Sequence, residues 1–151
     1  MAEEPIVLLL SGPNLTLLGE REPHIYGTAT LADHVSAATA EATAHGLALE
    51  HVQSDAEADL VGAVHGARGR VAAIVVNAAA LTHYGWSLSD ALSAFDGPVV
   101  ELHISNPDAR ESWRRTSVVS PVVTGTISGF GGHGYRLAVL AIAALIGDPA
   151  T

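Results

Sequence analysis

The stretch PIVLLLSGPN, residues 5–14, joins an apolar run to a turn that contains glycine and proline. Four more apolar runs follow along the chain: LALEHV (47–52), VAAIVV (71–76), PVVELHI (98–104) and PVVTGTI (121–127). Runs that are apolar almost throughout are typical of strands in a parallel sheet whose two faces are both covered. We therefore predict five parallel strands over these runs.

Helical patterns fill the intervals between the runs. Residues 31–45 follow Thr30, and Asp33 stands three positions after it, which is an approximate capping box at the start of a helix. Gly46 is a suitable residue to end that helix.

Residues 55–67 follow Ser54, with Glu57 three positions later in the stricter form of the same signal. Further helices are expected over 86–95 and 134–146, with a short one over 109–116. Alternating strands and helices, joined by right-handed crossovers, predict an α/β, flavodoxin-like three-layer sandwich with strand order 2-1-3-4-5. The length of 151 residues suits a single domain over 1–151.

Composition excludes several classes of function. The net charge of −9 disfavours a nucleic-acid or anionic-membrane partner. The chain has no cysteine, so it has no disulfide and no thiolate nucleophile. All seven basic residues are arginines, so Schiff-base catalysis by a lysine and a P-loop are both excluded. The acidic start MAEEP is unlike a secretory signal, and no apolar stretch is long enough to span a membrane, so we expect a cytoplasmic protein.

Polar side chains gather where three of the predicted strands end. They are Asn14, Asn77, Thr82, His83, Glu101, His103 and Ser105. In the proposed strand order these three strands are neighbours, and ligands of such folds bind outside the carboxyl ends of the strands. The sequence therefore predicts a site at this edge of the sheet.

These groups suit general acid–base chemistry. A histidine with a carboxylate two residues away, as in Glu101 and His103, can be oriented as a general acid. A phenol acts as a base only if its pKa falls from about 10 toward neutrality, which a nearby cation promotes. Tyr26 shares an unusually long loop, residues 11–27, with Arg21, and Arg114 is a second candidate cation. Proton abstraction beside a carbonyl, followed by loss of a hydroxyl, would pass through an enolate because no lysine is available.

Each of these residues also has a purely structural interpretation. Asn14 could be a turn residue, Tyr26 an ordinary loop aromatic, and His103 a core histidine. The remaining histidines are interpreted as solvated or helix-face residues with no metal site: His34, His45, His51, His65 and His133. The glycine-rich segment 128–135 is interpreted mainly as a tight turn, with anion binding as the alternative.

An ordered series of motifs resembles the type II 3-dehydroquinate dehydratases over residues 5–146. The matching pieces are Gly12-Pro13-Asn14-Leu15, Leu18-Gly19, Arg21-Glu22-Pro23, Tyr26-Gly27, Asn77, Leu81-Thr82-His83, Glu101 to Asn106, Ala109-Arg110-Glu111, Ser120-Pro121 and Gly134-Tyr135. The resemblance implies cofactor-free anti elimination of water from 3-dehydroquinate, which gives 3-dehydroshikimate in the shikimate pathway.

The resemblance also implies roles for the catalytic residues. Tyr26 would remove a proton from C2, and Arg21 would stabilise the ionised phenol. Asn14 would help to hold the water that stabilises the enolate. His103, oriented by Glu101, would protonate the departing C1 hydroxyl.

Other matched positions imply binding roles. Asn77, Ile104 and Ser105 would bind the substrate carboxylate, and His83 and Arg114 would bind ring hydroxyls.

Two features of assembly and motion are implied in the same way. The family resemblance implies a homododecamer, a tetramer of trimers, in which Asp90 reaches the site of a neighbouring subunit. The loop 18–26 would be a mobile lid that carries both Arg21 and Tyr26.

Departures from the family pattern leave alternatives open. The chain has Ser11 where asparagine is usual, Ala78-Ala79-Ala80 where glycine is usual, and changes over 84–89. A close analogue such as an amino-substituted dehydroquinate is therefore an alternative substrate. A flavin carrier is a non-enzymatic alternative on the same fold, whereas a phospho-receiver is excluded because the acidic pair and the lysine that it needs are missing.

Overall fold

A computed structural model of the chain describes residues 3–147. Five parallel strands form one sheet in the order β2-β1-β3-β4-β5. The strands are β1 (Ile6–Ser11), β2 (Ala48–Gln53), β3 (Ala73–Asn77), β4 (Val99–His103) and β5 (Gly125–Ser128). The predicted fold class and strand order are confirmed. The predicted start of the last strand at 121 is wrong, because a 3-10 turn, η5 (Ser120–Val122), occupies that position.

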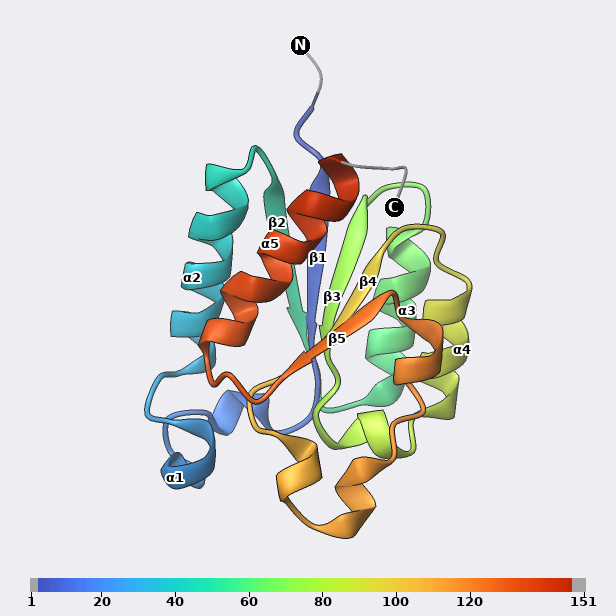
Figure 1. Cartoon of the computed structure of the whole chain (residues 1–151). Helices are drawn as coiled ribbons and strands as arrows, with labels where there is room; N and C mark the ends of the chain where they lie inside the picture. Colours follow the sequence, from blue (N-terminus) through green and yellow to red (C-terminus); the bar gives the residue numbers. More distant parts are fainter. Residues whose placement is uncertain (1–2, 148–151) are drawn as a thin grey trace.

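Helices cover both faces of the sheet. In Figure 1, α2 (Leu31–Ala44) and α5 (His133–Gly147) lie on one face, whereas α3 (Glu57–Ala67) and α4 (Trp86–Ser93) lie on the other. Alternate side chains of the central strand β1 supply both cores: Val7 and Leu9 pack with α2 and α5, and Leu8 and Leu10 pack with α3 and α4. Because both faces are covered, the central strands β1 and β3 are apolar up to their last residue.

The two capping predictions had different outcomes. The capping box at the start of α2 is confirmed, since Thr30 and Asp33 exchange side-chain hydrogen bonds with each other's backbone N–H groups. The box expected from Ser54 and Glu57 is wrong. Ala56 caps α3, and the Glu57 carboxylate instead accepts a 3.0 Å hydrogen bond from the backbone N–H of Leu88. Glu57 therefore links α3 to the first turn of α4.

The helix expected over 109–116 is also wrong. Two short 3-10 turns, η3 (Pro107–Ala109) and η4 (Ser112–Arg115), stand there instead. The backbone between them is extended at Arg110, with φ −115° and ψ −159°. This break turns the Arg110 side chain toward the carboxyl end of the sheet, where it lines the pocket described below.

Two of the histidines interpreted as solvated or helix-face residues are packed into the structure: His34 on the inner face of α2, and His51 on β2. His34 is 7% exposed and stacks on Tyr135, with ring centroids 4.8 Å apart and the planes 6° from parallel. His51 is half-buried on β2, with its Nε2 2.8 Å from Ser11 Oγ. Burial lowers the pKa of both histidines.

The remaining short elements all lie near the carboxyl edge of the sheet. They are η1 (Leu15–Leu17), α1 (Pro23–Tyr26) and η2 (Ala79–His83). No helix within residues 3–147 is both long enough and apolar enough to cross a bilayer.

Candidate active site

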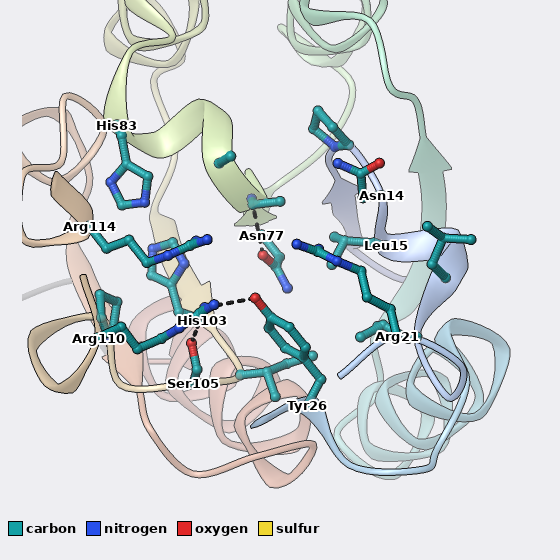
Figure 2. Close-up of a pocket in the computed structure, with 17 residues that line it drawn as sticks. Asn14, Leu15, Arg21, Tyr26, Asn77, His83, His103, Ser105, Arg110 and Arg114 are labelled. Carbon is teal, nitrogen blue, oxygen red and sulfur yellow. Dashed lines mark hydrogen bonds between the residues drawn. The ribbon is translucent and has the colours of Figure 1, made fainter. Parts of the chain in front are cut away.

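A pocket opens at the carboxyl ends of β1, β3 and β4, where the sequence predicts a site (Figure 2). Nine of the eleven residues proposed for the site line it: Asn14, Arg21, Tyr26, Asn77, His83, His103, Ile104, Ser105 and Arg114. Of the other two, Glu101 lies next to His103 on β4, whereas Asp90 does not line the pocket.

Glu101 is completely buried, and its carboxylate is surrounded by hydrogen-bond donors. It accepts hydrogen bonds from the side chains of His103 (2.7 Å), Thr82 (2.6 Å), Ser120 (2.5 Å), Ser117 (3.1 Å) and Thr126 (3.3 Å). Burial alone would raise the pKa of Glu101, but the hydrogen bonds from His103, Ser120 and Thr82 outweigh it and lower the pKa to about 2. The carboxylate is therefore ionised at neutral pH.

His103 is held in one orientation by this carboxylate. Its Nε2–H donates to Glu101 Oε2 at 2.7 Å, and its side chain is 12% exposed where it lines the pocket. The other ring nitrogen, Nδ1, is the one left to exchange a proton with a ligand. A buried anion next to an imidazole also stabilises the imidazolium, which is the form that can act as an acid.

Tyr26 ends the four-residue helix α1, and its hydroxyl points into the pocket. Arg110 Nη1 donates a 2.7 Å hydrogen bond to the Tyr26 hydroxyl and a 3.2 Å hydrogen bond to Ser105 Oγ. The guanidinium of Arg110 also lies 5.2 Å from the centroid of the Tyr26 ring. A phenolic oxygen that accepts a hydrogen bond from a cation is stabilised in its ionised form.

Arg21 lies near the Tyr26 ring but makes no hydrogen bond to its hydroxyl. Its guanidinium lies 5.7 Å from the centroid of the Tyr26 ring and 3.6 Å from the carboxylate of Glu22. Figure 2 shows the Arg21 side chain entering the pocket from the side opposite to Arg110. Both arginines therefore flank Tyr26, but the direct hydrogen bond comes from Arg110.

Asn14 stands on the turn that follows β1. Its backbone is left-handed, with φ 67°, and its N–H donates to Asp55 Oδ1 at 2.9 Å. The side-chain amide of Gln53 contacts the same turn, since Gln53 Nε2 donates to the Gly12 carbonyl at 3.2 Å. A Cβ on Gly12 would lie 2.5 Å from the Ala78 carbonyl oxygen, so only glycine allows this turn to pack against the one after β3.

Asn77 ends β3, and its side chain is fixed on both sides. Its Oδ1 accepts the N–H of Ala79 at 3.2 Å, and its Nδ2 donates to the hydroxyl of Tyr135 at 3.0 Å. Ala79 itself is left-handed, with φ 53°. A left-handed backbone is unfavourable for a residue with a Cβ and favours glycine, so Ala79 is a strained position in the turn after β3.

His83 and Arg114 line the pocket from η2 and η4. His83 Nδ1 donates to the Thr116 carbonyl at 2.6 Å, which leaves Nε2 as the hydrogen-bond acceptor. Arg114 Nε donates to Glu111 Oε2 at 2.6 Å, and its guanidinium lies 4.1 Å from the centroid of the Trp113 ring. Both side chains are thus oriented before a ligand binds.

The glycine-rich segment after β5 supports the end of β4. Gly129 N–H donates to the His103 carbonyl at 3.3 Å, and Gly131 N–H donates to the Ile104 carbonyl at 3.0 Å. These contacts agree with the tight-turn interpretation of the segment, and they hold Ile104 and Ser105 at the pocket.

Asp90 lies on α4 with an exposed side chain, outside the pocket of its own chain. Its expected contact with a neighbouring subunit, and the homododecamer itself, stay predictions. In the described part of the chain, no three histidine, aspartate or glutamate side chains are grouped so as to hold a metal ion.

Sequence reasoning missed two parts of the site. Arg110 appeared in a matched motif without a role, and the helix wrongly expected over 109–116 gave no reason to turn it inward. The hydroxyl groups around Glu101 were also missed. Thr126 could have been found, because it is the partner of Glu101 in the register between β4 and β5. Ser117 lies in irregular chain and Ser120 begins the 3-10 turn η5, and neither position carries such a signal.

Comparison with known proteins agrees with this arrangement. The model of the family "Dehydroquinase class II" matches residues 5–143. A 3-dehydroquinate dehydratase of Corynebacterium glutamicum (strain R) is 51% identical over 133 residues, which cover 88% of this chain and 92% of the relative. A "3-dehydroquinate dehydratase 2" of Pseudomonas putida is 46% identical over 147 residues, which cover 97% and 99%.

A solved structure shows the same fold. The type II dehydroquinase of Propionibacterium acnes superposes with a TM-score of 0.89 at 43% identity, covering 95% of this chain and 98% of that one. Sequence, fold and family match agree over nearly the whole length, and the chain therefore belongs to the class II dehydroquinase family.

Proposed function

We propose that this protein is a 3-dehydroquinate dehydratase, a hydro-lyase that removes water from 3-dehydroquinate by anti elimination without a cofactor. The observation that carries the proposal is the presence of two proton-transfer pairs in one pocket: Tyr26 with Arg110, and His103 with Glu101. One pair suits a base and the other an acid, and an elimination of water requires both.

The first step is proton removal from C2. The phenolate of Tyr26 takes the proton, and the electron pair of the C–H bond moves to the C3 carbonyl to give an enolate. The guanidinium of Arg110 stabilises the phenolate through its 2.7 Å hydrogen bond, and Arg21 adds positive charge from the other side of the ring. Asn14 stabilises the enolate oxygen through a bound water.

The second step is loss of the C1 hydroxyl. The enolate electrons form the C1–C2 double bond, the C1–O bond breaks, and His103 gives its Nδ1 proton to the departing oxygen, so that water leaves. Glu101 keeps Nε2 protonated and stabilises the imidazolium before the transfer. Proton exchange with water then returns Tyr26 and His103 to their starting forms.

The remaining polar groups bind the substrate. We assign the carboxylate to Asn77 and to the backbone N–H groups of Ile104 and Ser105, and the ring hydroxyls to His83 and Arg114. This assignment is supported by the free Nε2 acceptor of His83 and by the preformed orientation of Arg114. Residues 84–89 do not line the pocket, so no observation favours the amino-substituted analogue.

A direct assay tests the proposal. Purified protein mixed with 3-dehydroquinate is expected to generate the ultraviolet absorbance of a conjugated enone. Well-folded protein that gives no signal between about pH 6 and 9, the range that spans an ordinary histidine pKa, would overturn it. Parallel measurement with the amino-substituted analogue decides between the two substrates, since the better substrate has the higher kcat/KM.

A further inference from the structure

Tyr135 does not line the pocket, but it contacts Asn77, which does. It belongs to the first turn of α5 and is 1% exposed. Its hydroxyl nevertheless reaches the carboxyl end of β3, where Asn77 Nδ2 donates a 3.0 Å hydrogen bond to it. A buried hydroxyl group is costly unless it is hydrogen-bonded, so this contact accounts for a tyrosine at a core position.

Two contacts fix which way the Asn77 amide faces. The Ala79 N–H can only donate, so the atom opposite it must be the amide oxygen, at 3.2 Å. The amide nitrogen then faces the Tyr135 hydroxyl. If the amide were reversed, its N–H groups would oppose the Ala79 N–H. The Ala79 N–H thus selects the orientation of the amide, and the Tyr135 hydroxyl anchors its nitrogen.

One N–H of the Asn77 amide is left over. Within residues 3–147 the Nδ2 group has Tyr135 as its hydrogen-bond partner, which uses one of its two protons. Asn77 lines the pocket, and Figure 2 shows its amide projecting toward the middle of the cavity. The second proton is therefore available to an oxygen atom of a bound ligand.

The Tyr135 ring is itself held in place. The ring of His34 stacks on it at 4.8 Å, and a Cβ on Gly132 would lie 2.3 Å from the His34 ring, so the three residues pack without spare room. Burial raises the pKa of the Tyr135 phenol to about 12, so the hydroxyl stays neutral at any working pH. It is a fixed, uncharged partner for the amide.

We propose that Tyr135 is a positioning residue for substrate binding, which holds the Asn77 amide so that its second N–H points at the substrate carboxylate. The proposal rests on the proposed function, in which Asn77 binds that carboxylate. Tyr135 acts on binding and not on proton transfer, because it contacts neither Tyr26 nor His103 through a hydrogen bond.

The test is a double-mutant cycle with Tyr135→Phe and Asn77→Ala. Removing the hydroxyl is expected to raise KM for 3-dehydroquinate about tenfold, as for loss of a well-aligned hydrogen bond to a charged group, with kcat within about twofold. In the Asn77→Ala background, Tyr135→Phe should have no further effect on KM. Independent, multiplying effects on KM, or an unchanged KM in Tyr135→Phe, would overturn the proposal.

Ile142→Val is the matched control. Ile142 is also buried on α5, about two turns further along the helix from Tyr135, and belongs to the same core, so trimming it disturbs that core. Its KM is expected to equal that of the wild type. If Ile142→Val raises KM as much as Tyr135→Phe does, the effect belongs to general packing of α5 and the proposal fails.

A measurement on the side-chain amides does not depend on turnover. The chain has three asparagines and one glutamine, so a spectrum of ¹⁵N-labelled protein contains four side-chain amide pairs. We expect an Asn77 amide proton to exchange with solvent much more slowly than those of the exposed Asn106, and to lose this protection in Tyr135→Phe. Equal exchange of Asn77 and Asn106 in the wild type would refute the positioning role even if Tyr135→Phe fails to fold. Wild-type protein that shows a protected Asn77 but no turnover would refute the proposed function alone.

Discussion

His103 and Tyr26 face the same pocket from two different kinds of scaffold. His103 ends a strand inside the sheet, and its carboxylate partner is completely buried among donors from several segments. Tyr26 ends a four-residue helix in a long loop. The helix begins after Glu22, whose backbone is left-handed (φ 42°), and Glu22 pairs with Arg21 through side chains that are 41% and 44% exposed.

Under the proposed mechanism, the acid and the base are therefore positioned in different ways. The acid is oriented by the fold itself, so it is in place whenever the protein is folded. The base depends on a loop with few buried contacts and on the arginines that approach its ring from both sides. Segments of this kind are drawn from the less stable parts of a protein, which agrees with the prediction that residues 18–26 form a mobile lid.

The largest effect is expected from removing the base. Tyr26→Phe should lower kcat about a thousandfold, within the range for loss of a general base, while KM changes only a few-fold. Steady-state kinetics measure both constants. Tyr84→Phe is the control, because Tyr84 is 58% exposed and lies outside the pocket. Near-normal turnover of Tyr26→Phe would show that Tyr26 is not the base.

A smaller effect is expected on the acid side from Glu101→Gln. The amide cannot accept all the hydrogen bonds that the carboxylate accepts, so we expect unfolding to require about 3 kcal/mol less and kcat to fall about a hundredfold. Denaturant unfolding and steady-state kinetics measure the two changes. A Glu101→Gln variant as stable as the wild type would show that the carboxylate is not needed to hold His103 and the surrounding segments in place.

Acid titration sharpens the same prediction. Because the folded-state pKa of Glu101 is about 2, below its ordinary value of 4.5, its ionised form stabilises the protein fully above about pH 4.5. That contribution should be lost as the pH falls from about 4.5 toward 2. The difference in stability between wild type and Glu101→Gln is therefore expected to shrink over this range, as measured by urea unfolding at each pH.

Comparing the two arginines tests the base side in finer detail. Arg110→Met should lower kcat about tenfold to a hundredfold, since a charged hydrogen bond to the phenolic oxygen is lost. Arg21→Met should have a smaller effect on kcat, because the Arg21 guanidinium lies 5.7 Å from the centroid of the Tyr26 ring and makes no hydrogen bond to its hydroxyl in the described structure. Arg115→Met is the control for removing an exposed charge next to Arg114. The opposite ranking of the first two variants would mean that Arg21 replaces Arg110 at the hydroxyl when substrate binds.

The smallest effect is expected at Ala79. Its left-handed backbone (φ 53°) is unfavourable for any residue with a Cβ, so Ala79→Gly should stabilise the protein by about 1 kcal/mol. Thermal unfolding would show this as a Tm increase of about 2–4 °C for a chain of this size. A lower Tm would mean that the added flexibility of glycine outweighs the relief of strain.

Much of the fold could be predicted because the central strands β1 and β3 are apolar on both faces and end in polar residues. The positions where the predictions were wrong share a physical cause, which is contact between segments far apart in the sequence. Glu57 could cap its own helix, but the start of α4 offers it a different N–H group. His34 is polar, yet stacking on Tyr135 and the absence of a side chain at Gly132 make a buried position available.

The candidate site was predictable to the extent that it follows strand ends. Asn77 and His103 could be placed from the sheet alone. Arg110 could not, because its position depends on a break between two 3-10 turns that no local pattern announces.

The cage of donors around Glu101 has a consequence for engineering. Its members come from β4, η2, β5, η5 and the irregular chain before η5, so a single buried side chain fastens five separate pieces of backbone together. Libraries that aim to change which ring systems this enzyme accepts should leave that fastening intact. They should instead diversify the positions of the 18–26 loop and of η4 other than Arg21, Tyr26 and Arg114, because altered side chains there can change the entrance of the pocket without disturbing the hydrogen bonds around Glu101.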